Sequence, residues 1–261
     1  MSKLIILGSG AAPGVPSVSG GWGACNPNNP KNRRQRAGVY LSDGSTQLLV
    51  DTSPDLKNQL IANNITEVDG VLYTHTHADH LHGIDDLRGI TRNTGHSLNF
   101  YATMPQIEEI KKRFSYAFSN VEHFDITNRP ELLPVEIKYG EKFAVGTFDI
   151  MPLEFGGHTM TTTGFCFNDG QTVLVPDFKF IPPQTLEYLQ KIDVDVLIMP
   201  LTMLREGRYH AGIDIILDSA SKIAAKRVVL THMATECDFD EVMNLTPENM
   251  EPAFDNMIIE F

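Results

Sequence analysis

The chain has 261 residues, in which 33 aspartates and glutamates outnumber 21 lysines and arginines for a formal net charge of −12. This acidity argues against a long groove that tracks a nucleic-acid backbone, because such a groove needs clustered cations. The three cysteines, Cys25, Cys166 and Cys237, are widely spaced and odd in number, so they predict no disulfide framework and favour a reducing compartment. No apolar run reaches the length of a signal peptide or a membrane span, and we therefore expect a cytoplasmic protein with no membrane partner.

Short β-rich runs alternate with helical patterns along the whole chain. The first half predicts strands at Leu4–Leu7, Gly38–Leu41, Gln47–Val50, Gly70–Thr74 and Asn99–Ala102, and helices at Pro54–Asn63 and Pro105–Phe118. The second half predicts strands at Phe143–Val145, Phe148–Phe155, Gly164–Asn168, Thr172–Val175, Val194–Met199, Arg227–Thr231 and Asn256–Phe261, and helices at Pro182–Gln190 and Ile213–Ala225. No linker rich in proline or serine divides the chain, so residues 1–261 are expected to form a single domain. We predict an α/β (α+β) arrangement of two mixed sheets packed face to face with helices outside.

A long loop rich in glycine, proline and asparagine runs from Gly8 to Pro30, between the first two predicted strands. Loops of this length in compact domains are often functional. The loop begins Gly8-Ser9-Gly10, but Pro13 occupies the third position of a dinucleotide-binding fingerprint, which favours a plain turn. The loop is followed by Lys31-Asn32-Arg33-Arg34-Gln35-Arg36, the main basic cluster of the chain. This cluster is either a solvated segment or a patch that meets an anionic substrate.

The densest group of metal-binding side chains is Thr74-His75-Thr76-His77-Ala78-Asp79-His80, which places four candidate ligands within six positions. Imidazole and carboxylate together suit zinc and related divalent transition metals. The preceding residues read as a short buried strand, and an extended end would put His75 and His77 on one face. Asp79 and His80 follow the turn and can reach a second ion.

Three further candidates share one pattern, an apolar strand followed by a side chain that can bind metal. They are His158 after Phe155-Gly156-Gly157, Asp177 after Val175-Pro176, and His232 after Leu230-Thr231. Strand ends present side chains from a rigid scaffold to one rim. With the histidine motif, they predict a site for two divalent metal ions as cofactors. The sequence leaves open whether the metal is zinc, manganese or iron.

These pieces, together with Val50-Asp51-Thr52, make the chain resemble the metallo-β-lactamase-fold hydrolases. The resemblance implies a four-layer αββα sandwich with the active site along one edge of the sheets. It also implies a first metal held by His75, His77 and His158, a second held by Asp79, His80 and His232, and Asp177 bridging the pair. Asp51 would orient the ligand rings. An aspartate rather than a thiolate at the bridging position resembles the hydrolase and phosphodiesterase branches, not the true β-lactamases.

Three more segments resemble the PhnP group, whose namesake is a phosphodiesterase that acts on phosphoribosyl cyclic phosphate. They are Leu7–Gly10 with Gly14–Pro16, Gly83–Arg88 after the metal motif, and Tyr209-His210 before a helix. This resemblance implies that His210 lies at the active site and donates a proton. The early loop of that group carries several cysteines that bind a structural zinc. Here it carries only Cys25, so no structural zinc is expected.

We therefore predict a hydrolase whose partner is a small-molecule phosphodiester, cyclic ones included. Two divalent ions about 3.5–4 Å apart lower the pKa of a shared water to roughly 7, and the resulting hydroxide would attack phosphorus. The expected catalytic residues are Asp79 and Asp177, which hold the metals, and His210 as general acid. A homodimer is compatible with this sequence.

Three alternatives stay open. The first is a nuclease like tRNase Z or an exonuclease of the same fold, against which the acidic charge and the missing accessory arm weigh. The second is a hydrolase of thioesters, lactones or lactams, against which His210 weighs. The third is a non-catalytic binding or carrier protein like PqqB, against which the full set of seven ligands weighs. His82, Asp85, Asp86 and Arg88 are expected to be structural, and His96 and His123 to have no special role.

Overall fold

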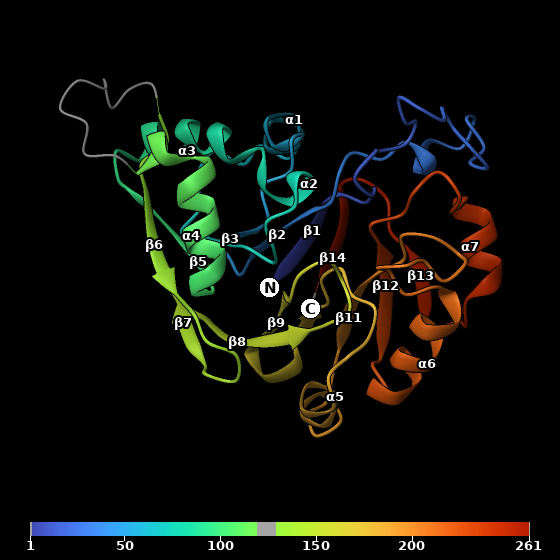
Figure 1. Cartoon of the computed structure of the whole chain (residues 1–261). Helices are drawn as coiled ribbons and strands as arrows, with labels where there is room; N and C mark the ends of the chain where they lie inside the picture. Colours follow the sequence, from blue (N-terminus) through green and yellow to red (C-terminus); the bar gives the residue numbers. More distant parts are fainter. Residues whose placement is uncertain (1, 119–128, 261) are drawn as a thin grey trace.

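Two seven-stranded sheets face each other in the computed structural model, which describes residues 2–118 and 129–260 (Figure 1). The first sheet has the strand order β14-β1-β2-β3-β4-β5-β6. Its strands are β1 (Lys3–Gly8), β2 (Gly38–Ser42), β3 (Gln47–Val50), β4 (Gly70–Leu72), β5 (Leu98–Ala102), β6 (Leu132–Glu136) and β14 (Met257–Glu260). Antiparallel pairs join β14, β1, β2 and β3, whereas β3 to β6 run parallel to one another.

The second sheet has the strand order β13-β12-β11-β10-β9-β8-β7. Its strands are β7 (Phe143–Val145), β8 (Phe148–Phe155), β9 (Thr162–Phe167), β10 (Thr172–Leu174), β11 (Val196–Pro200), β12 (Arg227–Thr231) and β13 (Met250–Pro252). Strands β10 to β13 run parallel, and β7, β8 and β9 are joined to them by antiparallel pairs. Each sheet is therefore mixed, as the sequence predicts.

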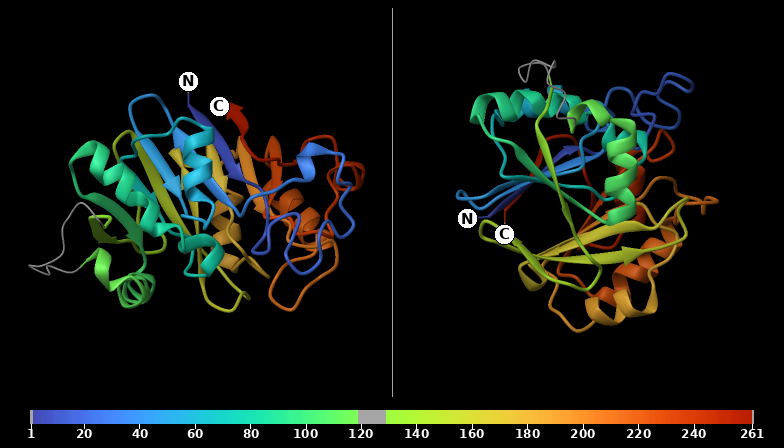
Figure 2. Two further views of the ribbon diagram at one scale, coloured as in Figure 1. Left: turned by 90° about the horizontal axis from the view of Figure 1, so that it is seen from above. Right: turned by 60° about the vertical axis from the view of Figure 1, so that its left-hand side comes forward.

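Helices cover the outer face of each sheet and complete four layers (Figure 2). The helices are α1 (Leu56–Ala62), α2 (Ala78–Leu81), α3 (Leu87–Thr94), α4 (Met104–Arg113), α5 (Pro183–Leu189), α6 (Ile213–Ile223) and α7 (Phe239–Leu245). Side-chain alternation explains the layers: in β1, Leu4 and Ile6 pack between the sheets, while Ile5 and Leu7 pack beneath the helices. The αββα sandwich is confirmed. The helices of the described residues all lack the length and apolarity that a bilayer crossing requires.

Several predicted ends of helices and strands are wrong, and several short elements were not predicted. The helix expected at Pro105–Phe118 stops at Arg113, because Phe114 leaves the helical region at φ −120° and ψ 42°, and a separate 3₁₀ turn follows. The strand expected at Gly70–Thr74 ends at Leu72. The sequence did not predict α2, α3, α7, β6 and β13, which span between three and eight residues and are too short for a clear apolar period.

The long early loop packs against the chain near α7, so segments from opposite ends of the sequence lie side by side (Figure 1). Ala24 N donates to Thr235 O, and the buried Cys25 thiol lies 3.5 Å from the carbonyls of Thr235 and Cys237. Arg34 is also buried here, and its guanidinium contacts the Cys25 sulfur at 3.8 Å. Burial raises the pKa of the Cys25 thiol. These contacts therefore hold the early loop against the segment that precedes α7.

Candidate metal centre

The candidate site lies along one edge of the sandwich, where several strands end. Because β3 runs parallel to β4, and β10, β11 and β12 run parallel to one another, the residues that follow them collect at common edges. Strand β8 has the same direction as β10, since each is antiparallel to β9. The residues that follow these ends, within a few positions, are Asp51, His75, His158, Asp177, Thr202 and His232.

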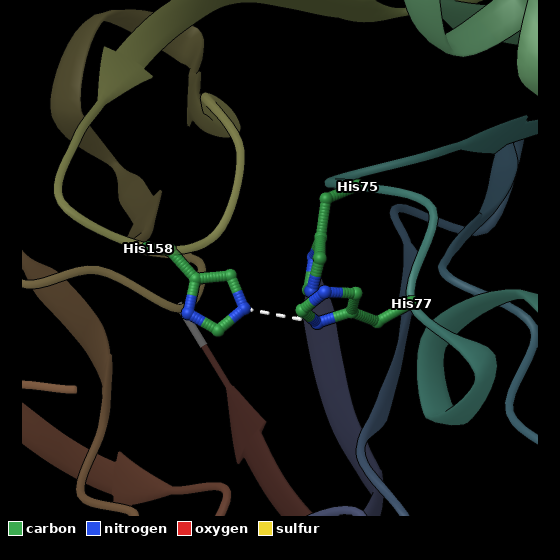
Figure 3. Close-up of side chains that lie close together, drawn as sticks. All are labelled: His75, His77 and His158. Carbon is green, nitrogen blue, oxygen red and sulfur yellow. Dashed lines mark hydrogen bonds between the residues drawn. The ribbon is translucent and has the colours of Figure 1, made fainter. Parts of the chain in front are cut away.

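The first ligand group is His75, His77 and His158, which each offer one nitrogen within 4.8 Å of the others (Figure 3). His158 Nε2 lies 2.9 Å from His77 Nδ1. His158 Nδ1 lies 3.1 Å from the carbonyl of Tyr209. A carbonyl only accepts, so Nδ1 carries a proton and Nε2 is the nitrogen that faces the other ligands of the group.

His75 provides the clearest test of whether a metal fits. Thr74 Oγ1 donates to Asp51 Oδ2 at 2.7 Å, so this hydroxyl must accept from His75 Nδ1, which lies 3.0 Å away. The proton of the neutral ring is then on Nδ1, and Nε2 is a lone pair. That Nε2 is buried and has no hydrogen-bond partner. An orphaned buried acceptor is costly, and a bound cation would satisfy it.

The second ligand group is Asp79, His80 and His232, which are all buried. His232 Nε2 lies 3.2 Å from both His80 Nε2 and Asp79 Oδ2, and His80 Nε2 lies 3.4 Å from Asp79 Oδ2. Two imidazole nitrogens and one carboxylate oxygen therefore converge on a single point.

Asp177 stands between the two groups. Its Oδ2 lies 3.8 Å from His80 Nε2 and 4.0 Å from His158 Nε2, so it reaches one member of each group. Its Oδ1 lies 3.3 Å from His232 Nδ1. The structure thus brings all seven predicted ligands together. A set made of imidazoles and carboxylates fits divalent transition metals such as zinc and manganese.

Asp51 organises the histidine motif from below. It accepts from Thr74 N at 2.8 Å and Thr74 Oγ1 at 2.7 Å, and it lies 2.7 Å from His80 Nδ1. Because the carboxylate accepts the proton of His80 Nδ1, His80 Nε2 faces the centre. Asp51 has a backbone φ of +64°, in the left-handed region that aspartate tolerates better than most residues. The bend directs its side chain toward the motif on the neighbouring strand.

Protonated His80 offsets part of the negative charge of the carboxylates in this centre. Burial lowers the pKa of His75 well below its usual range, aided by the neighbouring imidazoles, so this ring is neutral. Burial also opposes charge on His80, but Asp79 and Asp51 outweigh it and hold the His80 pKa well above its usual range. Burial likewise opposes charge on Asp79, yet His80 and His232 hold the pKa of that carboxyl low. A metal that binds here must displace the His80 proton.

His210 lies beside the two ligand groups. Its ring centroid is 4.8 Å from that of His158, and its Nδ1 is 3.9 Å from Asp177 Oδ2. Burial lowers the pKa of His210 to about 4, although Asp177 acts in the opposite direction. The imidazole is therefore neutral near pH 7 and carries one N–H.

Thr202 is a site residue that the sequence did not predict. Its hydroxyl lies 3.1 Å from His210 Nδ1 and 3.1 Å from His232 Nδ1, so it connects the candidate acid to a candidate metal ligand. Thr202 follows β11 just as Asp177 follows β10 and His232 follows β12. The strand-end pattern was present, but a threonine is not a metal-ligand type and gave no signal.

Gly157 shapes the turn that presents His158. Its φ is +81°, and an added Cβ would lie 2.3 Å from the Cβ of Lys179. Only glycine combines this conformation with this close approach. Lys179 in turn donates to the carbonyl of Gly207 and pairs with Glu206, which ties the segment before His210 to the segment after Asp177.

Other candidate residues lie outside this cluster. The exposed His82 ring packs edge-on against Phe114, with centroids 5.6 Å apart, and Asp85 pairs with Arg88 at 3.6 Å on the surface. Asp86 precedes α3. His96 is exposed in a loop. His123 lies outside the described residues.

The basic cluster from Lys31 to Arg36 is used largely within the protein. Arg36 pairs with Asp55 at 2.7 Å, Arg34 is buried, and the Lys31 ammonium lies 4.3 Å from the centre of the Phe239 ring. Arg33 lies over the Trp22 ring. These contacts favour the structural interpretation of the cluster over the substrate patch.

Comparisons with known proteins agree with this geometry. The beta-lactamase superfamily domain matches residues 46–233. A solved diphosphatase from the PhnP family is 27% identical, with a TM-score of 0.87 over 100% of this chain and 98% of the other. Zinc-bound PqqB from Methylobacterium extorquens is 18% identical, with a TM-score of 0.76 over 99% and 100% of the two chains, which shows the fold alone. The resemblance to PhnP-like proteins of the metallo-β-lactamase fold is confirmed.

One curated relative adds a different chemistry. An octanoyltransferase from Porphyromonas gingivalis is 27% identical over 257 residues, which is 98% of this chain but 51% of the relative. The chain thus spans about half the length of that protein.

Proposed function

The chain belongs to the beta-lactamase superfamily, and from this premise we propose that it is a metal-dependent phosphodiesterase acting on small phosphodiesters with two divalent ions, zinc or manganese. The observation that carries the proposal is the convergence of two ligand groups on Asp177, with His210 beside them. The 27% identity with a PhnP-family diphosphatase supports phosphorus rather than carbon as the centre attacked.

The ligands divide the work of holding the ions. His75, His77 and His158 would hold one, Asp79, His80 and His232 the other, and Asp177 would bridge them. Bound divalent ions supply Lewis acidity and lower the pKa of water to about 7. Asp51 keeps His80 Nε2 directed at the centre by accepting the Nδ1 proton. His75, Asp79, His80, Asp177 and His232 are buried, whereas His77 lies at the partly exposed side of the site.

Thr202 determines which nitrogen of His210 carries the proton. If His232 binds metal through Nε2, its Nδ1 holds a proton and donates it to Thr202 Oγ1. The threonine hydroxyl then donates to His210 Nδ1, so the N–H of the neutral His210 ring is on Nε2. His210 would use this N–H to stabilise negative charge on the leaving oxygen by a hydrogen bond. This refines the general-acid role expected from the sequence, because the ring is neutral at pH 7.

The test is hydrolysis of bis(p-nitrophenyl) phosphate by protein reconstituted separately with manganese and with zinc. We expect metal-dependent turnover that Asp177→Ala abolishes. Absence of turnover with two ions bound per chain would refute the proposal.

Thr202→Val tests the hydrogen-bond chain to His210. The substitution keeps the side-chain shape and removes the bridging hydroxyl. We expect kcat to fall on the order of tenfold, because a neutral hydrogen bond contributes about 0.5–1.5 kcal/mol. The assay contains saturating metal, because the same hydroxyl also orients the candidate ligand His232. Thr185→Val, which removes another buried hydroxyl that donates to a backbone carbonyl, is the control for the loss of a hydroxyl as such. Unchanged kcat in Thr202→Val would contradict the chain.

A second candidate function is hydrolysis of acyl thioesters. The observation that favours it is the identity with the octanoyltransferase, whose name denotes transfer of an eight-carbon acyl group. The same activated water could attack a carbonyl carbon. Hydrolysis of octanoyl-coenzyme A tests this candidate directly, with the released thiol detected by its reaction with a chromogenic disulfide. Turnover of the thioester without turnover of any phosphodiester would favour the second candidate over the first.

A further inference from the structure

A pocket of about 540 Å³ opens beside the first ligand group. Thr76, which stands between His75 and His77, forms one side, and Met160, two residues after His158, forms another. Thr76 Oγ1 lies 3.5 Å from the Met160 sulfur, and Thr159 Oγ1 lies 2.8 Å from His77 Nε2. The pocket is therefore lined by chain neighbours of the first ligand group, although none of the three ligands is itself part of the lining.

The far wall of this pocket is held by hydrogen bonds. Gln106 Nε2 donates to Thr74 O at 2.9 Å and to Thr163 Oγ1 at 3.2 Å, and Gln106 Oε1 accepts from Thr103 N. The Tyr139 hydroxyl lies 3.2 Å from the same Thr163 hydroxyl. These polar groups are occupied within the protein, so the wall is preformed.

Glu154 is the exception in this wall. It lies on β8 on the same side as Phe148, Ile150 and Pro152, which are buried between the sheets, because side chains two apart share a face. An acidic side chain at the end of an inward-facing apolar row breaks the alternation that packing alone predicts. Among the described residues, its carboxylate has neither an ion-pair nor a hydrogen-bond partner.

The charge of Glu154 acts on its surroundings. It contributes to a raised pKa of the Tyr139 hydroxyl, behind the larger effect of burial. The described residues that line the pocket include no lysine, arginine or histidine, so Glu154 carries the only formal charge among them. This partly buried carboxylate has no donor among the described residues, and a ligand that carries donors would form charge-assisted hydrogen bonds with it.

We propose that this pocket is the subsite for the organic arm of the substrate. Through Glu154 it selects an arm that carries hydrogen-bond donors, and it binds a cationic amine more tightly than a neutral arm. The same carboxylate rejects an anionic arm. This inference rests on the proposed phosphodiesterase function, since it names the substrate group that extends from the phosphorus at the metal centre.

Three p-nitrophenyl phosphodiesters that differ only in the second arm test the proposal: an ethyl, an aminoethyl and a carboxyethyl ester. The leaving group is constant, so differences in kcat/KM report the arm. We expect Glu154→Gln to lower the ratio of aminoethyl to carboxyethyl kcat/KM about tenfold, the size of one charge-assisted hydrogen bond. Metal content and thermal unfolding verify that the variant is folded.

Glu108→Gln is the matched control, because Glu108 is exposed on α4, is absent from the pocket lining and carries the same charge. It changes the net charge of this acidic protein equally and should leave the ratio within about twofold. Turnover of all three esters with an unchanged ratio in Glu154→Gln would overturn the subsite and leave the phosphodiesterase proposal standing. No turnover of any ester by the metal-loaded parent protein would overturn the phosphodiesterase proposal, and the subsite with it.

Discussion

Asp51 offers the sharpest test of how the centre is held, although it is not itself a candidate metal ligand. Its buried carboxylate accepts two hydrogen bonds from Thr74 and one from His80, at 2.7–2.8 Å. Asp51→Asn keeps the size of the side chain. Asparagine also tolerates the positive φ of +64°, so the backbone need not move. The substitution removes the charge and replaces one acceptor oxygen with a donor.

The magnitude follows from the bonds that are lost. In the metal-free protein His80 loses one of two carboxylates that raise its pKa, and a charged hydrogen bond contributes about 1.5–3 kcal/mol. We expect the free energy of unfolding to fall by about 2–3 kcal/mol. In the metal-loaded protein His80 is no longer held in orientation, and loss of such an outer partner lowers metal affinity about 10–100-fold.

Two measurements check this prediction: urea unfolding of the metal-free protein, and competition for zinc with a chromogenic chelator. Asp149→Asn, an exposed aspartate on β8, is the control for loss of one negative charge and should change both quantities little. If Asp51→Asn bound metal with parental affinity and unfolded at the parental urea concentration, Asp51 would not organise the centre.

Four further predictions concern the metal and its supports. Metal affinity should rise with pH, because the bound metal displaces the proton from His80, whose pKa is raised in the metal-free protein. Calorimetric titrations in buffers of different ionisation enthalpy should show proton release, and none at pH 6–7 would contradict this assignment. Protonated His80 also stabilises the folded protein without metal, and this stabilisation is complete below the pKa of an unfolded histidine, near 6.5. The stabilisation is lost as pH rises through the higher pKa that His80 has in the folded protein. The free energy of unfolding without metal should therefore fall between these two pKa values. Gly157→Ala should lower the free energy of unfolding by at least about 1–2 kcal/mol and weaken metal binding, because it displaces His158. Gly89→Ala is the control: Gly89 has open space around it on α3, so this substitution should leave the thermal unfolding temperature unchanged or raise it. Metal at 100 times its dissociation constant should stabilise the folded protein by about 2.7 kcal/mol, and a chelator should reverse the shift in unfolding.

The sequence was sufficient to name the candidate ligands that the structure brings together, because their signals are local. The histidine motif concentrates donors within six positions, and His158, Asp177 and His232 each follow an apolar run. A strand places the residue after it at a sheet edge whatever the rest of the fold does. The layered architecture followed for the same reason, since long apolar strands such as β8 were predicted to the residue.

Properties that depend on distant neighbours needed the structure. Thr202 connects His210 to His232 only because β11 and β12 are adjacent and parallel, and hydroxyl residues are common at strand ends. The proton position on His75 follows from a bond between Thr74 and Asp51, which are 23 residues apart. The basic cluster likewise could be assigned to internal contacts only once Arg36 was seen to pair with Asp55.

The sequence by itself therefore determined which side chains are available to bind metal and which elements present them, because residue type and strand periodicity are properties of short segments. Tertiary structure decided how protons and charges are distributed among them, because hydrogen bonds and burial depend on which strands become neighbours. Glu154 illustrates this difference. The sequence predicted that it lies on a strand, but only the packing of the two sheets placed its unpartnered carboxylate in the wall of a pocket.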